Sequence, residues 1–173
     1  MQEKRGEVIL ERDRATITFR RTLRHSIDKV WQAITNPEDL SAWLLQSAVI
    51  EPRQGGRIEY VSSPNPIVWY GKILIWDPPR VYEHEFNTDA DPRWSDYMRT
   101  ERTIARWELE DRGESTLLTL TFRGFTRGTA GGFAPGTHAF LDRLEAYLAK
   151  VPLPDWTRRF EEVRPLYRWE EAK

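Results

Sequence analysis

The chain has 173 residues, of which 39% are hydrophobic and 31% charged, and its formal net charge is −1. This length and composition allow one domain with a buried core. The near-zero charge gives no reason to expect nucleic acid or an anionic membrane as a partner, and the lack of cysteine excludes disulfides and thiolate chemistry. The chain shows neither an apolar run of about 20 residues, as a membrane span requires, nor a signal-peptide core. We therefore expect a cytoplasmic protein without membrane insertion, as a monomer or homodimer.

The sequence of the N-terminal part predicts one strand followed by two short helices. Residues 15–23 alternate between apolar and threonine-rich positions, which is typical of a half-buried strand. Arg21 falls on the inward side, where it needs a carboxylate or carbonyl partner, and an ion pair at the end of the sheet would provide one. Ser26 can cap a first helix, and Asn36 followed by Pro37 ends it and starts a second.

The middle of the chain predicts a succession of strands joined by short turns. Residues 1–13 form a ragged terminus or a short edge strand. Further strands are expected over residues 57–62, 67–76, 81–86, 103–109 and 116–123, with a polar loop over 87–97. Glu83 and Glu85 fall on the outer side of their strand, and we interpret them as solvated charges. Such strands form an antiparallel meander, which needs cover on its apolar face.

A long helix over residues 133–150 provides this cover. Its apolar stripe consists of Phe140, Leu141, Leu144, Tyr147 and Leu148. The glycine-rich segment 124–136 lacks the Gly-Lys-Ser/Thr ending of a phosphate loop, so we interpret it as a flexible entrance. Residues 153–173 predict an amphipathic extension, interrupted at Pro165, that packs on the outside of the domain or docks on a second subunit. The whole chain, 1–173, is then one domain with a core over 15–150.

A set of short motifs occurs in a fixed order along residues 15–150. The motifs are Val30–Glu38 with Trp43, Gly55–Arg57, Tyr70–Ile73, Asp77–Arg80, Trp107–Leu109, Thr116–Leu120 and Phe140–Leu144. Together they resemble the family of activators of the heat-shock-protein-90 ATPase, within the START / polyketide-cyclase-like (SRPBCC) superfamily. The resemblance implies an α+β helix-grip fold. In it, a curved antiparallel sheet of six to seven strands wraps around a long C-terminal helix, and two short helices follow the first strand.

The resemblance also implies an apolar cavity between the sheet and the last helix. The expected lining consists of Arg21, Trp69, Tyr82, His84, Phe86, Trp94, Trp107, Phe122, His138 and Leu141. Two departures from the family pattern concern the mouth of this cavity. The tryptophan that is common just before the last helix is missing, and Phe133 or His138 stands nearby. The segment 87–100 is also longer than usual. The fold could then stay open at Thr137 and His138. No metal or cofactor is expected, because the sequence has no closely spaced His/Asp/Glu pair.

Three functions remain open at this point. The first is a carrier or sensor that binds a small hydrophobic molecule in the cavity. The second is a cyclase- or hydrolase-type enzyme that uses His84, Arg21 or Tyr82 as acid–base or positioning groups. The third is a chaperone co-factor or another protein-interaction module, as the name of the family suggests. A fold of this kind hosts many functions, so the choice depends on the site.

Overall fold

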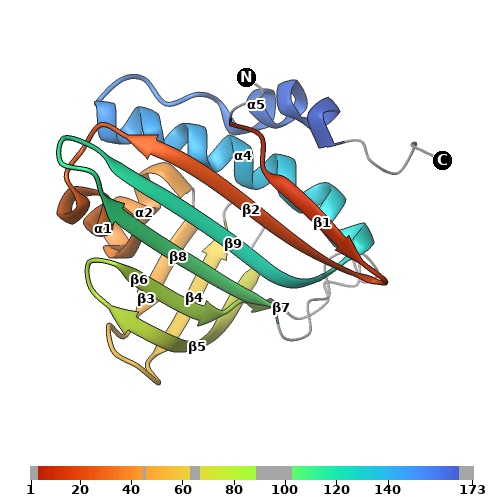
Figure 1. Ribbon diagram of the computed structural model, residues 1–173, viewed down its shortest axis with the longest axis horizontal. Coiled ribbons are helices and arrows are strands. Elements are labelled where there is room, and N and C mark those ends of the chain that lie inside the picture. The colour runs from red at the N-terminus through yellow and green to blue at the C-terminus, as the bar shows by residue number, and fades with distance from the viewer. Residues whose placement is uncertain (1–3, 45, 63–66, 89–102, 168–173) are drawn as a thin grey trace.

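The computed structural model describes residues 4–44, 46–62, 67–88 and 103–167 (Figure 1). Its elements are, in order, β1 (Glu7–Glu11), β2 (Arg14–Leu23), α1 (Ile27–Thr35), α2 (Pro37–Leu44), β3 (Gln46–Ile50), β4 (Arg57–Ser62), β5 (Val68–Asp77), β6 (Val81–Glu85), β7 (Asn87–Thr88), β8 (Ile104–Asp111), β9 (Thr116–Thr126), α4 (Arg127–Ala149), α5 (Trp156–Val163) and the 3₁₀ turn η2 (Arg164–Tyr167). The expected edge strand, the two short helices after β2 and the long C-terminal helix are all present.

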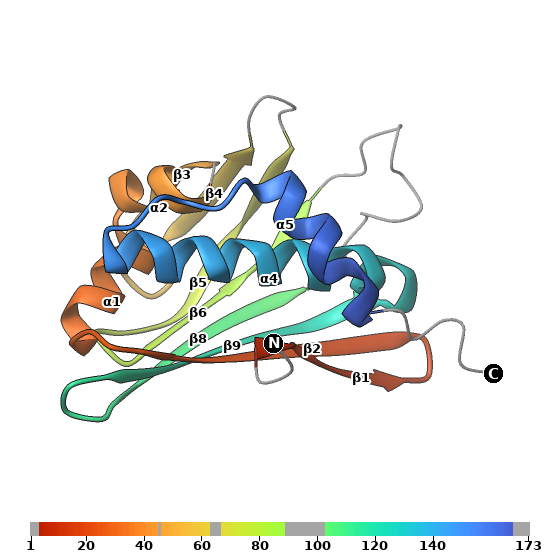
Figure 2. The ribbon, with the colours of Figure 1, turned by 90° about the horizontal axis from the view of Figure 1, so that it is seen from above.

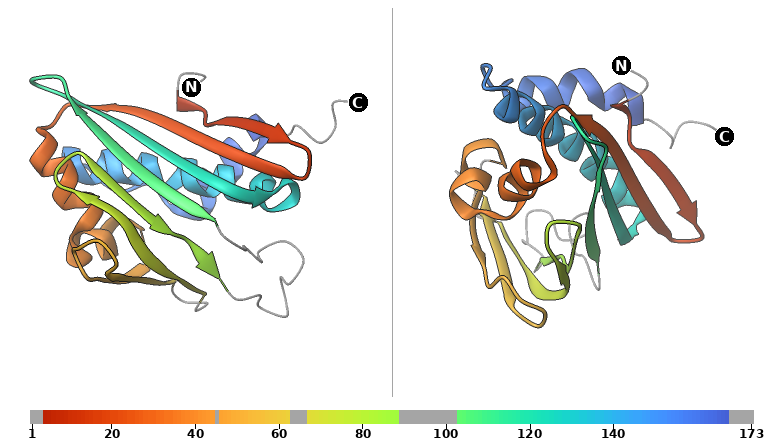
Figure 3. Two further views of the ribbon diagram at one scale, coloured as in Figure 1. Left: turned by 60° about the horizontal axis from the view of Figure 1, so that its bottom comes forward. Right: turned by 60° about the vertical axis from the view of Figure 1, so that its left-hand side comes forward.

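The strands of the described residues form one antiparallel nine-stranded sheet in the order β1-β2-β9-β8-β6-β5-β4-β3, with β7 beside β5. The sheet exceeds the expected six to seven strands because the short strands β1, β3 and β7 join it. It curves strongly (Figure 3), and α4 runs across its hollow side (Figure 2). This arrangement confirms the helix-grip fold.

The alternation in the sequence correctly predicts the inward faces of the strands. In β2, Ile17, Phe19 and Arg21 are buried, whereas the alternate residues Thr16, Thr18, Arg20 and Thr22 are partly or fully exposed. One outer position differs from the expectation. Glu83 is buried rather than solvated, because Arg106 and Arg123 hold its Oε2 atom at 3.0 and 3.1 Å.

The glycine-rich segment is helical, which corrects the prediction of a flexible entrance. Helix α4 begins at Arg127, and the Thr126 side chain caps it by accepting a hydrogen bond from the Thr129 amide. Pro135 consequently lies inside the helix rather than in its first turn. Glycine and proline are poor helix formers, so packing must stabilise these turns, and Ala130 and Ala134 are fully buried there.

The C-terminal extension packs against α4 of the same chain (Figure 2), which is the first of the two arrangements considered from the sequence. The α5 residue Trp156 donates from Nε1 to the Gly136 carbonyl at 3.3 Å, and its ring lies 5.4 Å from that of Phe140. A Cβ on Gly136 would lie 3.4 Å from the indole, which is ordinary van der Waals contact. As Pro165 predicts, α5 ends at Val163. Within the described residues, the helices are too short or too polar to cross a membrane.

Candidate functional site

Aromatic side chains fill the space between the hollow face of the sheet and the first half of α4. We call this cluster the aromatic interior, and its members are Trp31, Tyr60, Trp69, Trp76, Tyr82, His84, Phe86, Phe122, Phe125 and Phe133. Trp69 stacks on Phe86 with ring centroids 4.4 Å apart. Phe133 of α4 reaches the sheet, because its ring lies 4.9 Å from Phe122 and 4.5 Å from Phe125. The interior therefore runs continuously from α1 to the first half of α4.

Gly124 brings both phenylalanines of β9 to the inner face. The β2–β9 register skips this residue, pairing Thr16 with Arg123 and Ala15 with Phe125. Its φ of 94° lies in the left-handed region that glycine tolerates best. The resulting bulge lets Phe122 and Phe125 point inward although they are three residues apart.

A small polar group lies inside the aromatic interior. The hydroxyls of Tyr60 and Tyr82 are 3.4 Å apart, and the ring of His84 lies 4.7 Å from Tyr82 and 6.0 Å from Tyr60. The His84 Nδ1 atom is 2.8 Å from the carbonyl oxygen of Glu85, which can only accept, so Nδ1 carries the proton and Nε2 is left as an acceptor. The group thus offers hydroxyls and an imidazole nitrogen to the interior.

Burial keeps these three side chains uncharged at neutral pH. It lowers the pKa of His84 to about 4, although the hydrogen bond to Glu85 acts in the opposite direction. It also raises the pKa of Tyr60 to about 12 and that of Tyr82 well above its usual value. The interior is therefore apolar and uncharged, with a few hydrogen-bonding groups.

The structure does not bring the predicted site residues together in one place, and most of them lie in two separate clusters. Five of them belong to the aromatic interior: Trp69, Tyr82, His84, Phe86 and Phe122. Trp107 pairs with Tyr82 across β6 and β8, and Leu141 lies in the hydrophobic core. Arg21 and His138 belong to a different cluster. Trp94 falls outside the described residues.

The second group, which we call the terminal polar cluster, joins both ends of the described chain to α4. It comprises Lys4, Gly6, Arg21, His138, Asp142, Glu145, Arg159 and Tyr167. Tyr167 accepts a hydrogen bond from the Gly6 amide at 2.8 Å, and its hydroxyl lies 2.8 Å from His138 Nδ1. Arg159 Nε lies 2.7 Å from Asp142 Oδ2, which is also 3.5 Å from His138 Nε2.

These contacts correct two expectations about the mouth of the cavity. His138 is only 1% exposed and Thr137 8%, and both lie in the middle of α4 rather than at its start, so the fold is closed there. His138 also does not line the space that holds His84, because its ring contacts Phe19 and Tyr167 instead. Of the three side chains named for the enzymatic alternative, Arg21 lies outside the aromatic interior and is engaged by Glu145 and Asp142.

Replacing Tyr167 with phenylalanine is expected to lower the free energy of unfolding by about 1–2 kcal/mol, because the Gly6 amide and His138 Nδ1 both lose their partner. Urea unfolding at pH 7 measures the effect. Thr22→Val, at an exposed position of β2, serves as the control and should change stability by less than about 0.5 kcal/mol. Equal stabilities for wild type and Tyr167→Phe would show that the hydroxyl does not link the two ends.

The expected lining left out five members of the aromatic interior, namely Trp31, Tyr60, Trp76, Phe125 and Phe133. Tyr60 lies on the inward side of an alternating strand, so its parity could have identified it. Phe125 lies beyond the bulge at Gly124, and Phe133 lies in the segment that was expected to be a loop. In the part of the chain that the structure describes, no group of three or more His, Asp and Glu side chains is placed to hold a metal ion.

Comparisons with known proteins agree with this architecture. The model of the family described as activator of Hsp90 ATPase homolog 1-like protein matches residues 24–149. No curated protein sequence matches the chain. Among solved structures, CalU16 from Micromonospora echinospora is similar with a TM-score of 0.69 and 20% identity, over 94% of this chain and 92% of that one.

Two further structures extend the similarity in fold. Protein MLL2253 from Mesorhizobium loti aligns with a TM-score of 0.68 and 24% identity, over 80% of this chain and 99% of its own. The protein encoded by BPP1335 from Bordetella parapertussis aligns with a TM-score of 0.67 and 22% identity, over 98% and 91%. At such identities, these structures support the fold alone.

Proposed function

Because the chain belongs to the family of activator of Hsp90 ATPase homolog 1-like proteins, we propose that its aromatic interior binds a small, uncharged hydrophobic molecule that carries a hydrogen-bonding group. The observation that carries this proposal is the group formed by Tyr60, Tyr82 and His84, which places neutral hydrogen-bonding atoms among aromatic rings. Ligand sites typically combine such an apolar lining with a few polar atoms that fix orientation.

Within the residues that the structure describes, the hydrogen-bonding capacity of this group exceeds what the protein itself uses. The two tyrosine hydroxyls share one contact of 3.4 Å, which takes up one of their two protons. His84 Nε2 adds an acceptor. A ligand hydroxyl or carbonyl can therefore bond to the group, while the rest of the ligand contacts the rings.

Access to the interior would require Phe133 to move. Its side chain is half-buried and contacts Trp69, Phe86, Phe122 and Phe125. Binding of this kind needs no reacting side chain, which distinguishes it from the enzymatic alternative.

Titration with N-phenyl-1-naphthylamine, followed by its fluorescence, tests the proposal, and 2-naphthol and naphthalene are then used as competitors. The probe is expected to bind saturably. 2-Naphthol should compete about fivefold better than naphthalene, since one net hydrogen bond contributes about 1 kcal/mol. In Tyr82→Phe this preference should fall to less than about twofold, because one hydroxyl of the polar group is lost.

Thr22→Val is the matched control, since it also removes a hydroxyl and Thr22 lies exposed on the outer face of the same sheet. It should keep both the probe affinity and the preference for 2-naphthol. Absence of saturable probe binding to the wild type would refute the proposal. An unchanged preference in Tyr82→Phe would refute the assignment of the polar group.

A further inference from the structure

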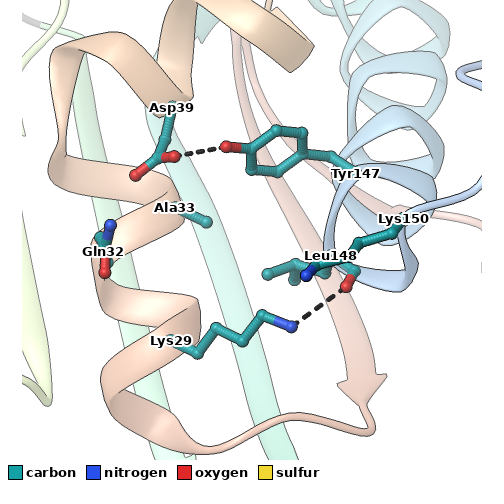
Figure 4. Close-up of a pocket in the computed structure, with 7 residues that line it drawn as sticks. All are labelled: Lys29, Gln32, Ala33, Asp39, Tyr147, Leu148 and Lys150. Atoms are coloured by element: carbon teal, nitrogen blue, oxygen red, sulfur yellow. Dashed lines mark hydrogen bonds between the residues drawn. The ribbon is translucent and has the colours of Figure 1, made fainter.

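A second site lies outside the aromatic interior, where α1 and α2 face the last turn of α4 (Figure 4). A surface pocket of about 230 Å³ is formed there. Its lining consists of Lys29, Gln32, Ala33, Asp39, Tyr147, Leu148 and Lys150. We propose that this pocket binds a small carboxylate with an apolar ring, and that the ammonium groups of Lys29 and Lys150 hold the carboxylate.

Two cationic side chains converge in this pocket. Figure 4 shows Lys29 from α1 and Lys150 from the end of α4 extending into the space between the helices, with their amino ends near Leu148. In the described parts of the chain, neither ammonium group forms an ion pair with a carboxylate. Two like charges at close range repel each other, and an anion between them removes that repulsion.

The Lys29 ammonium has spare capacity for such an anion. Its Nζ donates to the Leu148 carbonyl at 3.2 Å and lies 3.1 Å from His25 Nδ1. An ammonium has three donors, so one remains for a ligand. The contact with Leu148 also fixes the amino group at the wall of the pocket, which reduces the entropy lost on binding.

The negative groups of the pocket are already engaged by the protein. Asp39 is its only carboxylate, and it accepts a hydrogen bond from the Tyr147 hydroxyl, which raises the pKa of Tyr147 to about 12. A helix C-terminus ordinarily disfavours anions. Here the Leu148 carbonyl is bound by Lys29, and those of Ala146 and Tyr147 accept from the amides of Val151 and Lys150 at 3.1 Å each. An incoming carboxylate therefore meets ammonium groups that can donate to it, while the carbonyl groups nearby already accept hydrogen bonds.

The remaining lining favours an apolar body of limited size. Ala33 and Leu148 are buried and form an apolar wall, beside the half-buried ring of Tyr147. The volume of about 230 Å³ lies below the range that accommodates drug-sized molecules. A single aromatic ring that carries a carboxylate combines the required charge, shape and size.

Benzoate tests the proposal, with binding to the full chain followed by ¹H–¹⁵N NMR at constant ionic strength. Benzoate is expected to shift the amides of Gln32, Leu148 and Lys150 saturably, with a dissociation constant in the millimolar range. Benzyl alcohol, which has the same ring without the charge, should bind at least fivefold more weakly. Inorganic phosphate, which has the charge without the ring, should also bind at least fivefold more weakly than benzoate.

Lys150→Gln removes one of the two charges and leaves the Lys29 contact with α4 intact, so we expect it to weaken benzoate binding at least fivefold. Lys72→Gln, on the exposed side of β5, is the matched control and should bind benzoate as the wild type does. The proposal fails if these amides show no saturable shift, if either comparison ligand binds as tightly as benzoate, or if Lys150→Gln retains wild-type affinity.

Discussion

Replacing Arg21 with methionine is expected to lower the free energy of unfolding by about 3 kcal/mol. The Arg21 side chain is 2% exposed, and its Nε lies 2.9 Å from Glu145 Oε1 and its Nη2 3.7 Å from Asp142 Oδ1. Burial lowers the pKa of Arg21, while both carboxylates favour its charged form. Methionine fills most of the volume but leaves two partly buried carboxylates without this cation. Urea unfolding at pH 7 measures the change.

Two comparisons separate the buried charge from other effects of the substitution. Arg20→Met alters the neighbouring residue, whose side chain is 59% exposed and pairs with Glu7 at 3.5 Å, and it should change stability by less than about 0.5 kcal/mol. In Arg21→Met combined with Glu145→Met, the cost should be smaller than the sum of the two single effects. Strict additivity would show that the Arg21–Glu145 pair does not act as a unit.

Arg21 illustrates which part of an ion pair can be predicted from sequence. The alternation of β2 places Arg21 on the inward side, so the need for a partner follows directly. The identity of the partner does not, because Asp142 and Glu145 fall off the apolar stripe of α4 and would ordinarily face solvent. They become partly buried because α5 and the N-terminal residues pack over them, which helical periodicity does not encode.

The first half of α4 shows where local propensity fails. Gly128, Gly131, Gly132 and Pro135 all favour a loop, and a prediction from propensity alone must be a loop. The helix forms because it is packed on two sides. Ala130 and Ala134 are buried in the core cluster, and the Gly136 carbonyl accepts a hydrogen bond from Trp156 Nε1. Both contacts join segments distant in sequence, so only the folded chain contains that information.

The two candidate sites differ in how far sequence could predict them. Strand parity and aromatic residues identify most of the interior, and Tyr60 follows from the same rule. The pocket at the end of α4 has no comparable signal. Lys29 and Lys150 look like ordinary solvated charges of helices, and only the packing of α1 against α4 brings them together.

Acidification is expected to destabilise the protein through two buried histidines. Burial lowers the pKa of His84 to about 4 and, with smaller effects of Arg21 and Arg159, that of His138 to about 4 as well. The nearby Asp142 acts in the opposite direction on His138. Both values lie below the 6.5 that is usual for an unfolded chain, so between pH 6.5 and 4 the unfolded state binds more protons. The stability contributed by both histidines is thus present above pH 6.5 and is lost as the pH falls toward 4.

Urea unfolding at pH 7.5 and pH 4.5 measures this loss, which linkage sets at about 2.5 kcal/mol for each histidine. Carboxylates add to the fall at low pH, so the informative quantity is the difference between wild type and variants. His84→Gln and His138→Gln should each reduce the fall by about 2.5 kcal/mol, whatever their stability at pH 7.5. His25→Gln is the control. His25 is only partly buried, so this variant should retain most of the wild-type fall in stability. If His84→Gln and His138→Gln both retain it fully, the two imidazoles are not the groups that must be protonated for acid unfolding.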